Sequence, residues 1–290
     1  MPRLKTAIIL FTALLAALLS SGCSSVRLAY NNAPQLAWWW LDGYADFSRE
    51  QSPAARQAVD GFFEWHRRSQ LPDYAVWLAA IRPQLADNIS PAQACKLQDQ
   101  GRDKLEPALQ RAMAMASELV PGLGDAQFKA IEKRYAKVNQ TMRDDFLQPD
   151  PGDRDEANFK RALERAERLY GNLGAAQKRV LREGLAASPF NPEQWLVDRQ
   201  RAQRETLQTL RKLVAERAGA EQRVAALRAL VQRTEQSPNP EYKDYQLRLR
   251  DYNCAFAARL HNASTAAQRH QARDRFVGWE GDLRALVNGD

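Results

Sequence analysis

The sequence has few of the residues on which metal binding and covalent catalysis usually depend. It contains three histidines and three cysteines among 290 residues. No two residues have a His-x-x-x-His or Glu-x-x-His spacing, and no Gly-rich phosphate loop, Gly-x-Ser-x-Gly elbow or dinucleotide fingerprint occurs. The sequence therefore predicts neither a cofactor nor a metal site, and it favours a role other than catalysis.

The signals of β-structure are also missing. Strict alternation of apolar and polar residues does not occur, and no Asn-Gly turn is flanked by β-branched runs. Apolar residues instead recur at intervals of three and four, as at Phe128, Ile131, Tyr135, Val138 and Met142. This spacing predicts an all-α protein, a bundle of about nine to eleven helices.

Long apolar runs are absent except at the N-terminus. There, residues 7–19 are almost continuously apolar, follow the basic residues Arg3 and Lys5, and lead through small residues to Cys23. This order is typical of a secretory signal peptide. The run is shorter than the ~20 apolar residues that span a bilayer. We therefore expect residues 1–22 to be removed and the rest to be exported without a transmembrane helix.

Leu19-Ser20-Ser21-Gly22-Cys23 resembles the lipobox of bacterial lipoproteins, with its leucine one position further from the cysteine than usual. The resemblance implies cleavage before Cys23, a diacylglycerol thioether on its sulfur and an acylated N-terminus. Two or more acyl chains make anchoring stable, because each buried CH₂ contributes roughly 0.8 kcal/mol. Ser24 replaces the aspartate that commonly retains lipoproteins at the inner membrane, which favours the outer membrane. The alternative is an ordinary signal peptide followed by a cysteine by chance.

The distribution of charge limits the classes of partner that the protein could bind. The formal net charge of +7 includes two positive charges on the signal peptide, and acids and bases elsewhere are interleaved, as in residues 161–168. Such interleaving indicates solvated helical faces with i,i+4 pairs. Because export excludes nucleic acid, we expect the partners to be the lipid bilayer through Cys23 and an envelope protein or anionic lipid or polymer. Residues 23–33 would form a lipidated tether, and residues 34–290 a periplasmic helical domain.

Cys95 and Cys254 remain after Cys23 is assigned to lipid. An even number of cysteines in an oxidising compartment predicts a disulfide. Closing so long a loop would stabilise the fold by roughly 4–5 kcal/mol in the chain-entropy model. The alternative is two buried free thiols. Their wide separation, with no neighbouring histidines, argues against a zinc site.

A recurring pair marks the predicted helix starts. Ser, Thr, Gly or Asn stands three residues before Gln at 48–51, 90–93, 124–127, 174–177, 191–194, 219–222 and 265–268. This is the spacing of the capping box, in which the cap side chain accepts from the third helical N–H and the Gln accepts from the cap's own N–H. Helices are predicted to begin near residues 34, 49, 72, 91, 125, 154, 175, 192, 220, 240 and 266. The Pro- and Gly-containing segment 149–153 predicts a boundary between two lobes near residue 150.

Two resemblances concern the folded part. The segments Leu123–Gln127 and Leu173–Gln177 resemble the Leu-Thr-x-x-Gln motif of Spy/CpxP-type periplasmic helical proteins, although any capped helix also produces such a pattern. Tyr30-Asn31 and Trp65-His66-Arg67, which precede Leu-Pro-x-Tyr, resemble an uncharacterised family of proteobacterial lipoproteins, a domain of unknown function, over essentially the whole chain. That resemblance implies a helical lipoprotein and carries no activity.

Helical periodicity places the three consecutive tryptophans on different sides of the predicted helix. Leu36, Trp40 and Tyr44 lie on one helical stripe, which predicts that Trp40 belongs to the core. Trp38 lies roughly 200° away at about 100° per residue. Trp38 is therefore predicted to contact the membrane interface or a partner, where tryptophan is favoured. The alternative is burial of Trp38 under a second helix layer.

Polar residues near these tryptophans are the candidate site. Asp42 and Asp46 share a helix face, where two like charges need a positive partner. A carboxylate-oriented His66 would act as the general base of an envelope-acting hydrolase; the alternative is a structural ion-pair or hydrogen-bond cluster. The candidate cluster comprises Tyr30, Asn31, Trp38, Asp42, Asp46, His66, Arg67 and Tyr74. The leading hypothesis is a membrane-anchored lipoprotein with a binding, scaffold or chaperone-like role, and the enzyme is the second.

Overall fold

The computed structural model describes residues 25–289, so the predicted signal peptide and Cys23 lie outside it. Within this range every element is helical and no strand occurs, which confirms the all-α prediction. The elements are α2 (Ser25–Asn31), α3 (Ala33–Ala45), α4 (Ser52–Ser69), α5 (Leu71–Ile81), the 3-10 turn η1 (Arg82–Leu85), α6 (Pro91–Leu119), the 3-10 turn η2 (Val120–Gly122), α7 (Asp125–Phe146), α8 (Pro151–Tyr170), α9 (Ala175–Ala186), α10 (Pro192–Ala215), α11 (Ala220–Glu235), α12 (Pro240–Asn262) and α13 (Ala266–Asn288).

The described residues form twelve α-helices, one more than the upper limit of the prediction. Each of the eleven predicted starts lies within three residues of an observed one. Six of the seven predicted cap pairs form a hydrogen bond between the cap residue and the Gln. At Ser90, for example, the hydroxyl accepts from the Gln93 N–H at 3.2 Å, and the Gln93 side chain accepts from the Ser90 N–H at 2.7 Å. Helix α11 begins directly after Gly219 and lacks such a hydrogen bond.

The additional helix is α2, which lies in the predicted tether. Its residues pack against α13, and the Arg27 guanidinium lies 3.6 Å from the Asp282 carboxylate. Asn32 separates α2 from α3, which then packs against α4 and α7. From Ser25 onward, the residues predicted to form the tether are therefore helical and pack against the rest of the protein.

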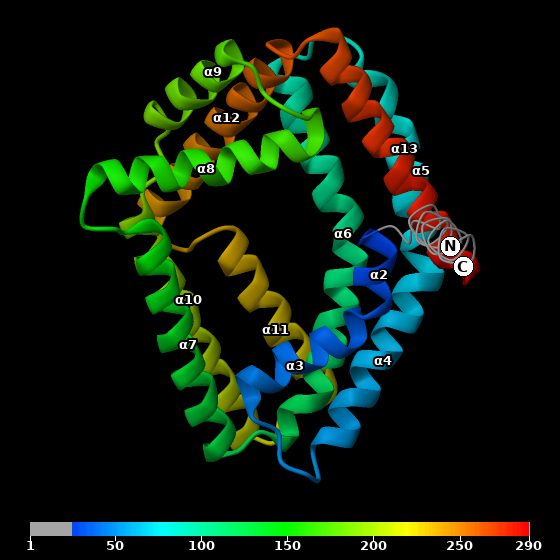
Figure 1. The fold of residues 1–290 in the computed structure, drawn as a ribbon. Helices are drawn as coiled ribbons and strands as arrows, with labels where there is room; N and C mark the ends of the chain where they lie inside the picture. Colours follow the sequence, from blue (N-terminus) through cyan, green and yellow to red (C-terminus); the bar gives the residue numbers. More distant parts are fainter. Residues whose placement is uncertain (1–24, 290) are drawn as a thin grey trace, which may run out of the picture.

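The helices are arranged around a ring (Figure 1). Helix α13 lies along α5, α6 packs against α11 and α12, and α7 packs against α10. These contacts join helices from both sides of residue 150, where the predicted lobe boundary falls in the connection between α7 and α8. Cys95 of α6 and Cys254 of α12 form the predicted disulfide, with their Cα atoms 5.2 Å apart.

The buried apolar residues form several small clusters. The largest joins α8, α9 and α13 and includes Phe159, Tyr170, Leu181 and Ala272. Two smaller clusters lie where η2 meets α10 and where α7 meets α10. The buried core is therefore divided among separate junctions, at each of which a few helices meet.

Cap glutamines connect helix ends that are far apart in the sequence. The Gln177 side-chain oxygen accepts from the Gly174 N–H at 2.6 Å, which caps α9, while its amide nitrogen donates to the Ala263 carbonyl at 3.2 Å. In return, Gln268 at the start of α13 donates to the Asn172 carbonyl at 2.8 Å. The two glutamine side chains also hydrogen-bond to each other.

A second junction repeats this exchange. Gln127 at the start of α7 donates to the Asp46 carbonyl at the end of α3, at 3.3 Å. Gln51 at the start of α4 donates to the Gly122 carbonyl at the end of η2. Glutamine suits these positions because its amide both accepts and donates, whereas a carboxylate accepts only.

Candidate functional site

His66 lies in the last turn of α4, where α2 and α5 approach it. Its Nδ1 and the Tyr30 hydroxyl oxygen are 2.8 Å apart, and the two rings are stacked with centroids 5.8 Å apart. Tyr74 of α5 presents its ring edge to the imidazole at 5.5 Å, and Phe62 stacks on it at 5.6 Å. The histidine is therefore half-buried among aromatic rings.

The adjacent Arg67 connects α2 with the C-terminal helix. It donates to the Asn31 side-chain oxygen at 2.8 Å and to the Leu286 carbonyl at 3.0 Å. Its guanidinium also lies 5.2 Å from the centre of the Tyr30 ring, which is cation–π range. We call Tyr30, Asn31, His66, Arg67 and Tyr74 the N-terminal cluster, since these predicted residues hold α2 against the body.

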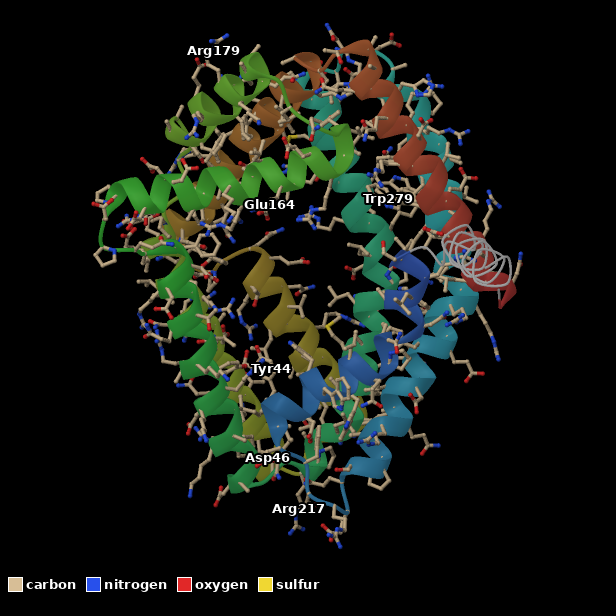
Figure 2. The ribbon with its side chains drawn as sticks, in the orientation of Figure 1. Tyr44, Asp46, Glu164, Arg179, Arg217 and Trp279 are labelled. Atoms are coloured by element: carbon tan, nitrogen blue, oxygen red, sulfur yellow. A yellow bond between two sulfur atoms is a disulfide. The ribbon has the colours of Figure 1, made fainter. Side chains whose placement is uncertain are left out.

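The two predicted carboxylates have other partners. Asp42 accepts from the Phe47 backbone N–H at 3.1 Å, and Asp46 is the C-cap of α3, with φ of 49°. Figure 2 shows Asp46 at the end of α3 opposite to α2. No hydrogen bond or ion pair found within residues 25–289 joins either carboxylate to His66. Asp42 and Asp46 therefore serve the C-terminal end of α3, and neither is placed to orient His66 as a general base.

Burial controls the ionisation of the N-terminal cluster. It lowers the pKa of His66 below its usual value of 6.5, so the imidazole is neutral at neutral pH. It raises the pKa of Tyr30 to about 12 despite the nearby Arg67 charge, and burial followed by Asp73 raises the pKa of Tyr74. Both phenols therefore stay protonated. The cluster holds a neutral imidazole whose Nδ1 already has a partner.

The structure corrects the assignment of the tryptophans. Trp38, predicted to be the interface residue, is 5% exposed; it stacks on Phe47 at 5.9 Å and lies under the Arg56 guanidinium at 4.3 Å. Trp40, predicted to be core, is 59% exposed, and Leu36 of the same stripe is 50% exposed. The prediction was wrong because α3 is apolar on both sides, so periodicity defines two stripes without identifying the buried one.

Sequence reasoning missed a second histidine–tyrosine pair. His261 of α12 is 2% exposed; its Nδ1 lies 2.8 Å from the Tyr170 hydroxyl, and its Nε2 lies 2.9 Å from the Asp87 carbonyl. Burial lowers the pKa of His261. The partners are far apart in the sequence, with no spacing signal that would have paired them. His270 instead forms an exposed pair with Asp274 at 2.9 Å.

A groove between α4 and α6 was also not anticipated. It has a volume of about 440 Å³ and is lined largely by small and apolar side chains, among them Ala58, Phe62 and Met115, with Arg111 and Glu118 beside them. Within residues 25–289, no group of His, Cys, Asp and Glu side chains is arranged to hold a metal ion. Over the same range, no helix has the length and apolar composition needed to cross a membrane.

A protein-family model matches more than half of the chain. The model of a family of unknown function, DUF6279, matches residues 43–243. The match begins inside α3 and ends inside α12, so it includes His66 and the disulfide cysteine Cys95 but not Tyr30. No curated protein and no solved structure matches the chain significantly.

Proposed function

We propose that this chain, which belongs to the DUF6279 family of unknown function, is a lipoprotein of the periplasmic face of the bacterial outer membrane with a binding or scaffold role. The lipobox-like Leu19–Cys23 carries the proposal, because it places a candidate acylated residue two positions before α2. The disulfide between Cys95 and Cys254 supports export, since such bonds persist in oxidising compartments.

The N-terminal cluster supports this proposal by connecting the anchor to the body. Tyr30 and Asn31 of α2 are bonded to His66 and Arg67 of α4, and Arg27 pairs with Asp282 of α13. A lipid on the residue two positions before α2 would then hold the whole helical ring in a defined orientation. The proposed role of the cluster is to position the body at the membrane surface.

A binding or scaffold role fits the described residues better than the hydrolase alternative. The predicted general base needs a carboxylate to orient His66, whereas the His66 Nδ1 pairs with the neutral phenol of Tyr30. Asp42 and Asp46, the proposed orienting carboxylates, serve the end of α3. The likeness to Spy/CpxP-type proteins favours a chaperone-like subtype, for which the groove between α4 and α6 is a candidate client surface.

Fractionation of bacteria tests the anchor. The wild-type chain should stay in the outer-membrane pellet after alkaline carbonate extraction. A chain in which residues 1–23 are replaced by an ordinary cleavable signal peptide should appear in the soluble periplasmic extract. As a control, Cys95→Ala/Cys254→Ala should still sediment with membranes, because it changes the body and keeps Cys23. Release of the wild-type chain by carbonate would contradict the proposal.

A further inference from the structure

A charge-free segment follows the proposed anchor. The chain is 27% charged, yet residues 28–41 contain no Asp, Glu, Lys or Arg. This segment comprises most of α2 and α3, and it lies before the start of the family match at residue 43. Soluble helices normally place charged residues on their solvent side, so the composition of this segment needs an explanation.

Several exposed residues of α2 and α3 recur at helical spacing. The two helices meet at Asn32, whose backbone is in the right-handed helical region; its N–H donates to the Leu28 carbonyl at 3.3 Å, and its carbonyl accepts from the Leu36 N–H at 3.0 Å. Within each helix, positions separated by three and four lie on the same side. The exposed residues with this spacing, which we call the uncharged face, are Leu28, Asn32, Gln35, Leu36, Trp39 and Trp40.

Large apolar side chains dominate the uncharged face. Leu28 and Trp39 are each 61% exposed, and Trp40 and Leu36 are nearly as exposed. The opposite side of α3 is fixed to the body through Trp38 and Ala45, both buried. The helix therefore cannot turn these side chains inward without removing Trp38 from its contacts with Phe47 and Arg56.

We propose that the uncharged face lies in the headgroup region of the bilayer that holds the acyl chains of Cys23, an inference that rests on the proposed lipid anchor. Leu28 follows Cys23 by five residues, and Trp40 follows Leu28 by twelve, a helical path of about 18 Å. The anchor therefore keeps the face close to the membrane. Tryptophan and leucine are favoured at the boundary between headgroups and acyl chains.

The absence of charge favours a bilayer over solvent as the occupant of this face. Charged groups would have to be desolvated on entering the interface, whereas Asn32 and Gln35 can remain hydrogen-bonded to headgroups and water. The face also starts at the residues next to the anchor, which is where the body first meets the membrane. A second copy of the chain or a protein partner on this face is an alternative that experiment separates.

Fluorescence quenching tests the contact directly. The lipidated protein is reconstituted into vesicles of phosphatidylethanolamine and phosphatidylglycerol with brominated acyl chains, which quench only nearby tryptophans. Of the seven tryptophans, Trp39 and Trp40 should account for the quenching. Trp39→Phe/Trp40→Phe, which keeps the face apolar, should therefore reduce the quenched fraction at least about fivefold. Trp195→Phe, at a tryptophan packed against Phe146 and Phe190, should leave it unchanged.

The possible outcomes separate the face from the anchor. Flotation of the vesicles reports whether the protein is lipid-anchored, independently of fluorescence. If the protein floats but brominated lipid does not quench it, or if quenching survives Trp39→Phe/Trp40→Phe, the face is not on the bilayer and the inference is overturned while the anchor stands. The wild-type protein in detergent could instead have twice the mass of one chain, and Trp39→Ser/Trp40→Ser could return it to the mass of one chain. That pair of results would assign the face to a second copy.

Discussion

Substitution of Gln177 by Glu should destabilise the fold far more than the same change at Gln93. Both glutamines accept from the N–H of their cap residue, Gly174 or Ser90, and a carboxylate preserves that bond. Only Gln177 also donates across the molecule, to the Ala263 carbonyl at 3.2 Å and to the Gln268 side chain. The introduced carboxylate has no N–H, so its second oxygen would face the Ala263 carbonyl oxygen and the Gln268 side-chain oxygen without a hydrogen bond.

The magnitude follows from burial and from the number of lost bonds. Gln177 is 5% exposed, so water cannot readily replace the missing donor. Two lost hydrogen bonds at about 1 kcal/mol each, and about 1 kcal/mol or more for an unsatisfied buried acceptor, give a loss of roughly 3 kcal/mol. Gln93 is exposed, and surface changes are usually within about 0.5 kcal/mol.

Urea unfolding followed by circular dichroism measures both variants against the wild type. We expect Gln177→Glu to lower the free energy of unfolding by roughly 3 kcal/mol and Gln93→Glu to change it little. Lowering the pH should narrow the gap, because a protonated carboxyl regains a donor for Ala263. Equal losses for the two variants would refute the proposed role of the cap glutamine as a connection between helix ends.

The remaining predictions concern α3, the disulfide and His66. Trp38→Ala should lower the free energy of unfolding by about 3–5 kcal/mol, as for buried aromatic residues, and Trp40→Ala by much less; chemical denaturation measures both, and the reverse order would contradict the observed faces of α3. Cys95→Ala/Cys254→Ala should lower it by about 5 kcal/mol, because the pair closes a loop with a sequence separation of 159; an unchanged urea midpoint would exclude a stabilising disulfide. Because burial lowers the pKa of His66 in the folded state, the unfolded state binds a proton more readily, so the stability this histidine contributes above pH about 6.5 falls as the pH drops through its folded pKa. NMR titration of its ring protons should show a midpoint below 6.5, and a midpoint at or above that value would contradict this burial effect.

Helix starts could be predicted because their signals are local. The hydrogen bonds at Ser90–Gln93 and Thr265–Gln268 lie within one helical turn, so residues three apart suffice to identify them. Helix α2 was missed because residues 23–33 were assigned to a tether and contain no residue pair with the cap–Gln spacing. The second bond of Gln177, to Ala263, links residues separated by 86 positions, and no local pattern reports it.

Part of the candidate site was predicted: several of its residues meet, but most of their partners were not foreseen. Tyr30, His66 and Arg67 were placed in one candidate cluster, and they do meet. The choice of partners was not predictable, because an aspartate near a helix end can be satisfied by the adjacent backbone, as Asp42 is by the Phe47 N–H. The buried side of α3 likewise depends on Arg56, which belongs to another helix.

The most direct test of the account is the mass of the N-terminal peptide of the protein purified from membranes. The proposed lipoprotein predicts a mature chain that begins at Cys23 and carries a diacylglycerol group on its sulfur and a further acyl chain on its amine. After hydroxide treatment, the loss of two ester-linked acyl chains should be visible. An N-terminus at another residue, or a Cys23 of unmodified mass, would contradict both the lipid anchor and the membrane contact inferred from it.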